Sequence, residues 1–185
     1  MIKYFFYILL ISMAISETLK KPEYLLIEKH GKIEIRQYSE YVIAKTSIKK
    51  GDMELNNNMF RTLAGYIFGG NQGNQSIPMT APVITKNDES NYDMIFFMLD
   101  AQKPEDLPKP NSKNVLIETI DIGKTVSITF GMWATEKRVN YYKKKLDKYI
   151  ADSNLEIVSS LMVAQYNSPW AVPPFRKNEL IYRIK

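Results

Sequence analysis

Apolar residues in this chain follow a period of two, then of about four, then of two again, and the whole series occurs twice. Period-two segments indicate half-buried strands, and spacings of three and four residues indicate an amphipathic helix. Helices are predicted from an N-cap at Asp52 to Ile67, with Leu55, Met59 and Leu63 on the apolar stripe, and over 135–151. Strands are predicted over 24–27, 33–36, 41–48, 77–85, 92–99, 115–120, 125–131, 156–166 and 179–184.

The strand-strand-helix-strand-strand order, read twice, constrains the architecture. One helix against several strands in each half is typical of an α+β domain with a curved antiparallel sheet. Neither half alone would bury its faces well, so we predict a single domain built from two pseudo-symmetric repeats. Within the second repeat, the segments 115–120 and 125–131 are expected to form a hairpin.

The predicted strand 77–85 carries Pro78 and Pro82, which lack the N–H that a sheet ladder needs. Both prolines fall on the same side of an extended segment, so they would weaken one edge and leave the other free to pair. Such a one-sided strand is expected at a cavity rim or barrel seam, with an architectural role. The proline-rich stretch 103–114 indicates an extended linker between the halves.

Residues 1–16 resemble a signal peptide. Lys3 gives a positive start, residues 4–15 form an apolar run, and Ala14-Ile15-Ser16 supplies a small-x-small site before Glu17. The alternative is a lasting anchor, but a span needs about 20 apolar residues. We therefore expect cleavage, a mature chain of 17–185 in the secretory pathway or outside the cell, and no stable membrane span.

The residue inventory leaves little room for catalysis. The chain has no Cys and a single His, His30, so thiolate sites and His-rich metal clusters are excluded. No G-x-S-x-G motif occurs, and the glycine-rich stretch 69–73 lacks the Lys-Ser/Thr ending of a phosphate loop. No carboxylate pair stands out, so we do not expect an enzyme.

Lysines and arginines crowd the second predicted helix, at Lys137, Arg138, 143–145 and Lys148. They lie opposite its apolar stripe, where a solvated face is the usual role of such charges. We therefore do not expect nucleic acid as a partner.

Two features point instead to a pocket for an apolar ligand with a polar rim. Nine methionines supply adaptable apolar surface, although each on its own fits a core position equally well. The segment 166–179 combines aromatic, proline and basic residues. Its Trp170 and Phe175 could contact a ligand while Arg176 or Lys177 meets an anionic group, or they could plug a barrel end.

Four ordered motifs resemble the SOUL haem-binding protein family: GKIEIRQY at 31–38, FRTLAGYIFGGN at 60–71, IPMTAPV at 77–83 and YNSPWAVPPFRKNE at 166–179. The resemblance spans essentially all of 24–185. It implies a distorted antiparallel β-barrel with two helices. It also implies non-covalent binding of haem or another tetrapyrrole without an established enzymatic reaction.

The resemblance also implies a site bordered by the first helix and the loop before the last strand. The matching residues are Met59, Leu63 and Ile67 on the helix, and Trp170, Phe175 and Arg176 in the loop. For the haem propionates, the candidates are Arg61 and Arg176.

His30 is the one histidine that could ligate the iron, so a monomer cannot use two. It precedes a glycine in a predicted turn, which favours an exposed side chain; a Met, a Tyr or no residue at all could take its place as axial ligand. We expect a monomeric haem carrier or scavenger. The alternative is a binding module for other amphipathic small molecules or a partner protein, without haem.

Overall fold

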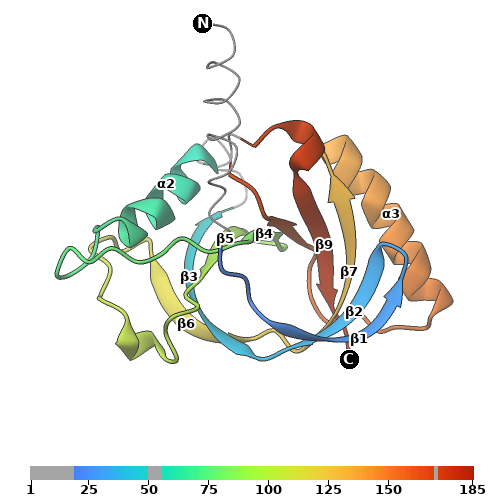
Figure 1. The fold of residues 1–185 in the computed structure, drawn as a ribbon, viewed down its shortest axis with the longest axis horizontal. Helices are drawn as coiled ribbons and strands as arrows, with labels where there is room; N and C mark the ends of the chain where they lie inside the picture. Colours follow the sequence, from blue (N-terminus) through green and yellow to red (C-terminus); the bar gives the residue numbers. More distant parts are fainter. Residues whose placement is uncertain (1–18, 50–55, 169–170) are drawn as a thin grey trace, which may run out of the picture.

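The computed structural model describes residues 19–49, 56–168 and 171–185. Within these ranges the chain forms nine strands, two α-helices and two short 3-10 helices (Figure 1). In chain order these are β1 Tyr24–His30, β2 Ile33–Tyr38, β3 Glu40–Lys49, α2 Asn56–Ile67, β4 Val83–Asn87, β5 Asn91–Phe97, η2 Pro104–Asp106, β6 Leu116–Asp121, β7 Lys124–Gly131, α3 Glu136–Asp152, β8 Met162–Gln165, η3 Pro173–Phe175 and β9 Lys177–Arg183.

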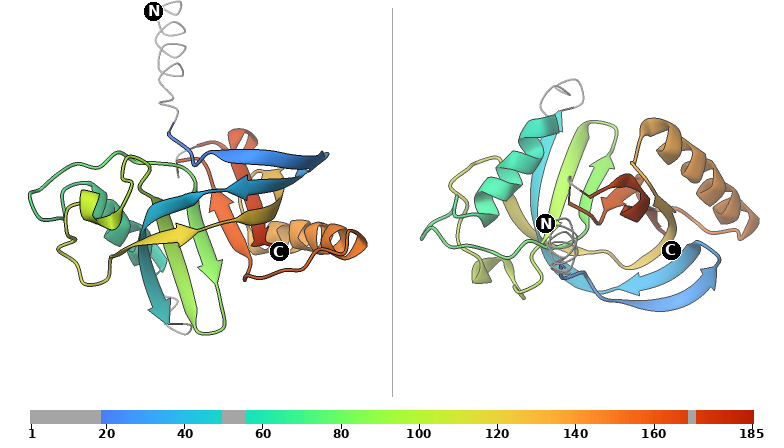
Figure 2. Two further views of the ribbon diagram at one scale, coloured as in Figure 1. Left: turned by 90° about the horizontal axis from the view of Figure 1, so that it is seen from below. Right: turned by 45° about the horizontal axis from the view of Figure 1, so that its top comes forward.

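All nine strands belong to one antiparallel sheet in the order β1-β2-β7-β9-β8-β4-β5-β3-β6. The sheet curls into a half-barrel, and α2 and α3 lie on opposite sides of the molecule (Figures 1 and 2). The α+β class and the curved, barrel-like sheet with two helices are therefore confirmed. The element order contains strand-strand-helix-strand-strand twice, but the pseudo-symmetry of the two repeats stays a prediction.

The two faces of β7 contact different parts of the protein. Val126, Ile128 and Phe130 are buried in the cluster under α3, as their alternation predicts. The intervening Thr125, Ser127 and Thr129 face the inside of the curled sheet. Because these residues are small, long side chains from neighbouring strands can meet above them.

Helix α3 forms where the sequence predicts it. The Thr135 side chain accepts a hydrogen bond from the backbone N–H of Arg138, which caps the first turn. The predicted apolar face packs on β7 and β9 with its five residues Val139, Tyr142, Leu146, Tyr149 and Ile150.

The expected hairpin of β6 and β7 is wrong. Strand β6 pairs with β3, whereas β7 pairs with β2 and β9. The chain turns at Ile122 and Gly123, the latter with φ 64°, and passes from one end of the sheet order towards the other. The backbone N–H of Tyr38 donates to the Gly123 carbonyl (3.0 Å) and Arg183 Nε donates to the Ile122 carbonyl (2.9 Å), which fixes this crossing.

The predicted strand 77–85 is shorter than expected. Strand β4 begins only at Val83 and pairs on both sides, with β5 and β8, so neither proline lies at one of its edges. The residues before β4 are held by single hydrogen bonds and not by a strand ladder. The Thr80 hydroxyl donates to the Phe97 carbonyl (2.7 Å) and the Ala81 N–H donates to the Lys20 carbonyl (2.9 Å). Proline cannot donate to a ladder, which explains why the strand starts after Pro82.

The proline-rich stretch 103–114 is not a free linker. The Tyr66 hydroxyl donates to the Pro108 carbonyl (2.9 Å), and the Gln72 N–H donates to the Lys109 carbonyl (2.8 Å). The stretch therefore packs against the end of α2 and the loop that follows, and it supports the helix.

The predicted signal peptide 1–16 with its cleavage site before Glu17, the N-cap Asp52, the stripe residue Leu55 and the loop residue Trp170 lie outside the described residues, so they stay predictions. In the part of the chain that the structure describes, no helix is both long and apolar enough to cross a membrane.

Candidate ligand-binding site

An apolar groove of about 250 Å³ runs beside α2. Its walls are Phe60 and Phe68 from the helix and its end, the stretch 79–83 before and into β4, and the stretch 165–168 after β8; Leu19 closes one side. Phe68 is 70% exposed and Phe60 37%, although both are large aromatic residues. Exposed aromatic side chains around a concavity are what an apolar ligand would cover.

The predicted helix stripe lies underneath this groove. Met59, Leu63 and Ile67 are buried (2%, 0% and 0% exposed) in the cluster between α2 and strands β3 and β5. These residues fix α2 on the sheet, so that the helix turns Phe60 towards the groove. Contact of the three with a ligand stays a prediction, and it would require α2 to move.

The loop between β8 and β9 is organised by Arg176. The Arg176 side chain is buried, its Nε donates to the Ala171 carbonyl (2.9 Å) and Nη2 donates to the Ser168 carbonyl (3.2 Å). The guanidinium also lies 3.6 Å from the ring centre of Trp133. Arg176 therefore shapes the loop at the end of the groove. Phe175 projects from it and is 71% exposed.

Of the two cations predicted for propionates, Arg61 is on the exposed surface of α2 and Arg176 is buried in the loop. Two lysines lie near the groove, Lys177, which the sequence also named for an anionic group, and Lys21, which it did not. The amines of Lys21 and Lys177 lie 5.8 and 4.4 Å from the ring centre of Tyr166, a groove residue. Lys177 is also 3.0 Å from a Glu179 oxygen, so Lys21 is the lysine better placed for an anionic ligand group.

His30 is not brought to the groove. It ends β1, is exposed as expected, and its Nε2 lies 2.5 Å from Glu28 Oε1. Its ring contacts Tyr149 near the end of α3 (5.5 Å between ring centres), whereas Trp133, beside Arg176, precedes the start of that helix. A 17-residue helix is about 25 Å long, which separates His30 from the groove.

A buried charge network lies behind the groove, on the inside of the curled sheet. Arg36 on β2 reaches over β7 and donates two hydrogen bonds of 2.9 Å to the carboxylate of Glu179 on β9. The Tyr166 hydroxyl donates to the same carboxylate (2.6 Å), and the Arg36 guanidinium also donates to Glu34 (2.6 and 2.8 Å). The ring of Tyr24 covers Arg36 at 4.3 Å.

The network determines the charge state of its members. Burial alone would raise the pKa of the Glu179 carboxyl, but the hydrogen bonds and charge of Arg36, with the Tyr166 hydroxyl, hold the pKa at about 2. Burial and the neighbouring Glu179 carboxylate raise the pKa of the Tyr166 hydroxyl well above its usual range. Tyr166 is therefore a neutral phenol whose proton is committed to Glu179, which disfavours it as a tyrosinate ligand.

Among the described residues, no three His, Asp or Glu side chains come together as a metal site. Among the described residues that line the groove, one is a soft donor, the Met79 thioether. Of these residues, Met79 is therefore the candidate ligand for an iron in the groove. Sequence reasoning did not select Phe60, Phe68, Lys21 or Tyr166. The signal available was that Phe60 within α2 and Phe68 just after it lie outside the buried stripe.

A protein-family model described as SOUL heme-binding protein matches residues 19–183. No curated protein matches the chain. Among solved structures, an uncharacterized conserved protein from Listeria innocua aligns with TM-score 0.65 at 12% identity, covering 83% of this chain and 92% of its own.

The EcmrR C-terminal domain aligns with TM-score 0.63 at 10% identity, covering 83% of this chain and 96% of its own. A hydrolase from Listeria innocua aligns with TM-score 0.59 at 12% identity, covering 86% of this chain and 94% of its own. At such low identity these likenesses concern the fold alone.

Proposed function

The chain belongs to the SOUL haem-binding protein family, and on that premise we propose that the groove beside α2 binds haem or another tetrapyrrole non-covalently. The observation that carries the proposal is the groove itself, an apolar concavity edged by two exposed phenylalanines with a lysine at its side. A flat macrocycle could lie against Phe60 and Phe68, with its carboxylates towards Lys21 or Arg61.

The groove volume constrains how such a ligand is held. Ligand pockets are typically about 300–1,000 Å³, so a groove of about 250 Å³ would cover only part of a tetrapyrrole. Partial burial and the absence of a strong iron ligand among the groove residues favour a carrier or scavenger that can release its cargo. We therefore propose a non-enzymatic role, and on the leader sequence a place in the secretory pathway or outside the cell.

The same small volume also fits the alternative ligand predicted from the sequence, a smaller amphipathic molecule with an apolar body and an anionic end. Such a ligand would use Phe60, Phe68 and Lys21 without any metal chemistry. Direct titration distinguishes the two, because a saturable Soret shift with hemin supports the tetrapyrrole, whereas a groove for a smaller ligand would give none.

Titration of hemin into a chain that begins at Glu17 tests the proposal, since that chain contains the whole matched domain. We expect a saturable Soret shift at one hemin per chain. Iron-free protoporphyrin IX should bind within about tenfold of hemin, because apolar contact rather than ligation supplies most of the affinity. A featureless rise without saturation would mean adsorption, and the proposal would fail.

Substitution of the single histidine tests ligation. Because His30 lies away from the groove, His30→Ala should leave the hemin spectrum unchanged and the dissociation constant within about twofold. Met79→Leu is the informative partner variant, since it removes the thioether in the groove and keeps the volume. A Soret band altered in His30→Ala but not in Met79→Leu would contradict the assignment of the groove.

A further inference from the structure

Four exposed apolar side chains gather at one edge of the molecule, and we name them the apolar rim. Met132 and Trp133 follow β7 and are 38% and 46% exposed, whereas Val172 precedes η3 and Phe175 is its last residue, and they are 55% and 71% exposed. The two segments are fixed to each other, because Asn178 Nδ2 donates to the Met132 carbonyl (2.8 Å) and Arg176 stacks on Trp133. The rim is therefore a built surface.

The apolar rim continues into the mouth of the groove. Arg176 donates to the Ser168 carbonyl, and the Lys177 N–H donates to Asn167 Oδ1 (2.6 Å). Ser168 and Asn167 both line the groove. Ligand groove and apolar rim thus share one loop, and a surface that covers the rim also covers the groove entrance.

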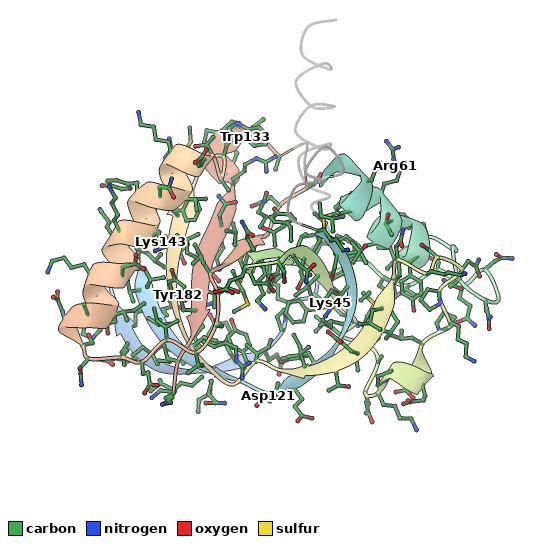
Figure 3. The ribbon with its side chains drawn as sticks, turned by 180° about the vertical axis from the view of Figure 1, so that it is seen from behind. Lys45, Arg61, Asp121, Trp133, Lys143 and Tyr182 are labelled. Atoms are coloured by element: carbon green, nitrogen blue, oxygen red, sulfur yellow. The ribbon has the colours of Figure 1, made fainter. Side chains whose placement is uncertain are left out.

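Exposed cations flank this edge. Lys137 lies in the first turn of α3, four residues after Trp133, and Lys21 lies beside the groove residue Tyr166. Figure 3 shows Trp133, just before the start of α3, and Arg61, on α2, at the same edge of the molecule. Glu136 is an acidic neighbour of Lys137, but the chain as a whole carries a formal charge of +5.

We propose that the apolar rim docks on an anionic phospholipid surface. Val172 and Phe175, on a short proline-rich loop, can enter the headgroup region without loss of backbone order, since Pro173 and Pro174 already fix it. Trp133 can enter beside them, because its ring is held against Arg176. Lysines and arginines around the inserted residues would meet lipid phosphates, at about 1 kcal/mol each. The combination of apolar tip and basic surround is what an anionic bilayer recognises.

Docking in this orientation would place the groove mouth at the bilayer, where apolar tetrapyrroles dissolve. Loading of the groove from lipid is the one part that rests on the proposed function. Docking itself depends only on the rim and the cations, so it can be tested without any ligand.

The test is co-sedimentation of the chain from Glu17, without hemin, with two kinds of vesicle. One is phosphatidylcholine alone, and the other is an equal mixture of phosphatidylcholine and phosphatidylglycerol. We expect at least about tenfold tighter binding to the mixed vesicles, weakened by salt. Emission of the tryptophans, which are only Trp133 and Trp170 in this chain, should shift to shorter wavelength on the mixed vesicles.

Two variants assign the binding to the rim. Val172→Ser with Phe175→Ser should weaken binding to mixed vesicles about tenfold or more, because exposed apolar area no longer enters the bilayer. Both side chains are exposed, so the fold should be retained. Lys137→Glu should weaken it about fivefold or more. The matched control is Ile157→Ser with Val158→Ser. These two side chains are also exposed, but they lie next to the far end of β9, so vesicle binding should be unchanged.

Each result is decisive. Equal affinity for the two kinds of vesicle, or no binding, overturns the proposal. A concentration-dependent dimer that Val172→Ser with Phe175→Ser dissociates would show that a second copy covers the rim, and would overturn it as well. Vesicle binding without a saturable hemin titration would keep the docking surface and remove the proposed ligand, whereas hemin binding without vesicle binding would do the reverse.

Discussion

Replacement of Arg36 by methionine is expected to lower the free energy of unfolding by about 3–5 kcal/mol, the largest effect of any single substitution considered for this chain. Arg36 and Glu179 are both almost completely buried and joined by two hydrogen bonds of 2.9 Å. Methionine fills a similar volume but leaves the Glu179 carboxylate without its principal counter-charge. Urea unfolding at neutral pH measures the loss.

The partner substitution should be milder. In Glu179→Gln the guanidinium of Arg36 keeps its two hydrogen bonds to Glu34, so no charge is left alone, and a loss of about 1–3 kcal/mol is expected. Arg61→Met is the matched control on an exposed arginine and should change stability by less than about 0.5 kcal/mol. The interpretation of the network would be wrong if Glu179→Gln cost more than Arg36→Met.

The network also makes the free energy of unfolding depend on pH. The pKa of Glu179 is about 2 in the folded chain against 4.5 ordinarily, so the folded state binds the proton less readily than the unfolded state. Its contribution, roughly 3 kcal/mol, is complete above the unfolded pKa and is lost as pH falls from about 5 towards 2. Glu179→Gln should therefore show a flatter fall of stability in this range, measured as urea midpoints at successive pH values.

The sequence predicted the parts of this fold that follow from local periodicity. The stripe Met59, Leu63 and Ile67 and the alternation of Val126, Ile128 and Phe130 are buried as expected, because a segment with one apolar face must bury that face. Pairing was less predictable. A short turn between two period-two segments fits either a hairpin or a bend in a curved sheet. Strands β6 and β7 are joined by a bend at Gly123 and pair with other strands.

The candidate site was predictable in place but not in composition. The sequence motifs point to α2 and the 166–179 loop, and the groove lies between them. The apolar period selects residues that are buried, whereas a groove is lined by apolar residues outside that period, such as Phe60 and Phe68. The Arg36–Glu179 pair joins residues 143 apart in the chain, and no local pattern indicates such a contact.

The second large effect that we expect is a loss of hemin affinity when the two groove phenylalanines are removed. Phe60→Ala with Phe68→Ala should weaken hemin binding about 10- to 100-fold, since covering their exposed area with a ligand is worth about 1–3 kcal/mol in total. The effect on stability should be smaller, because Phe68 is 70% exposed and Phe60 37% before any ligand binds. Hemin titration and urea unfolding of the same variant separate the two quantities.

The control has to be an exposed aromatic residue away from the groove. Tyr141 is 55% exposed on α3, and α3 lies on the other side of the molecule from α2 (Figure 1). Tyr141→Ala should leave the hemin dissociation constant within about twofold, since hemin at the groove never reaches it. If both variants lost affinity equally, hemin would be adsorbing to exposed aromatic surface in general. If neither did, the ligand would lie elsewhere, and the buried stripe of α2 would become the region to test, through a helix that moves away from the sheet.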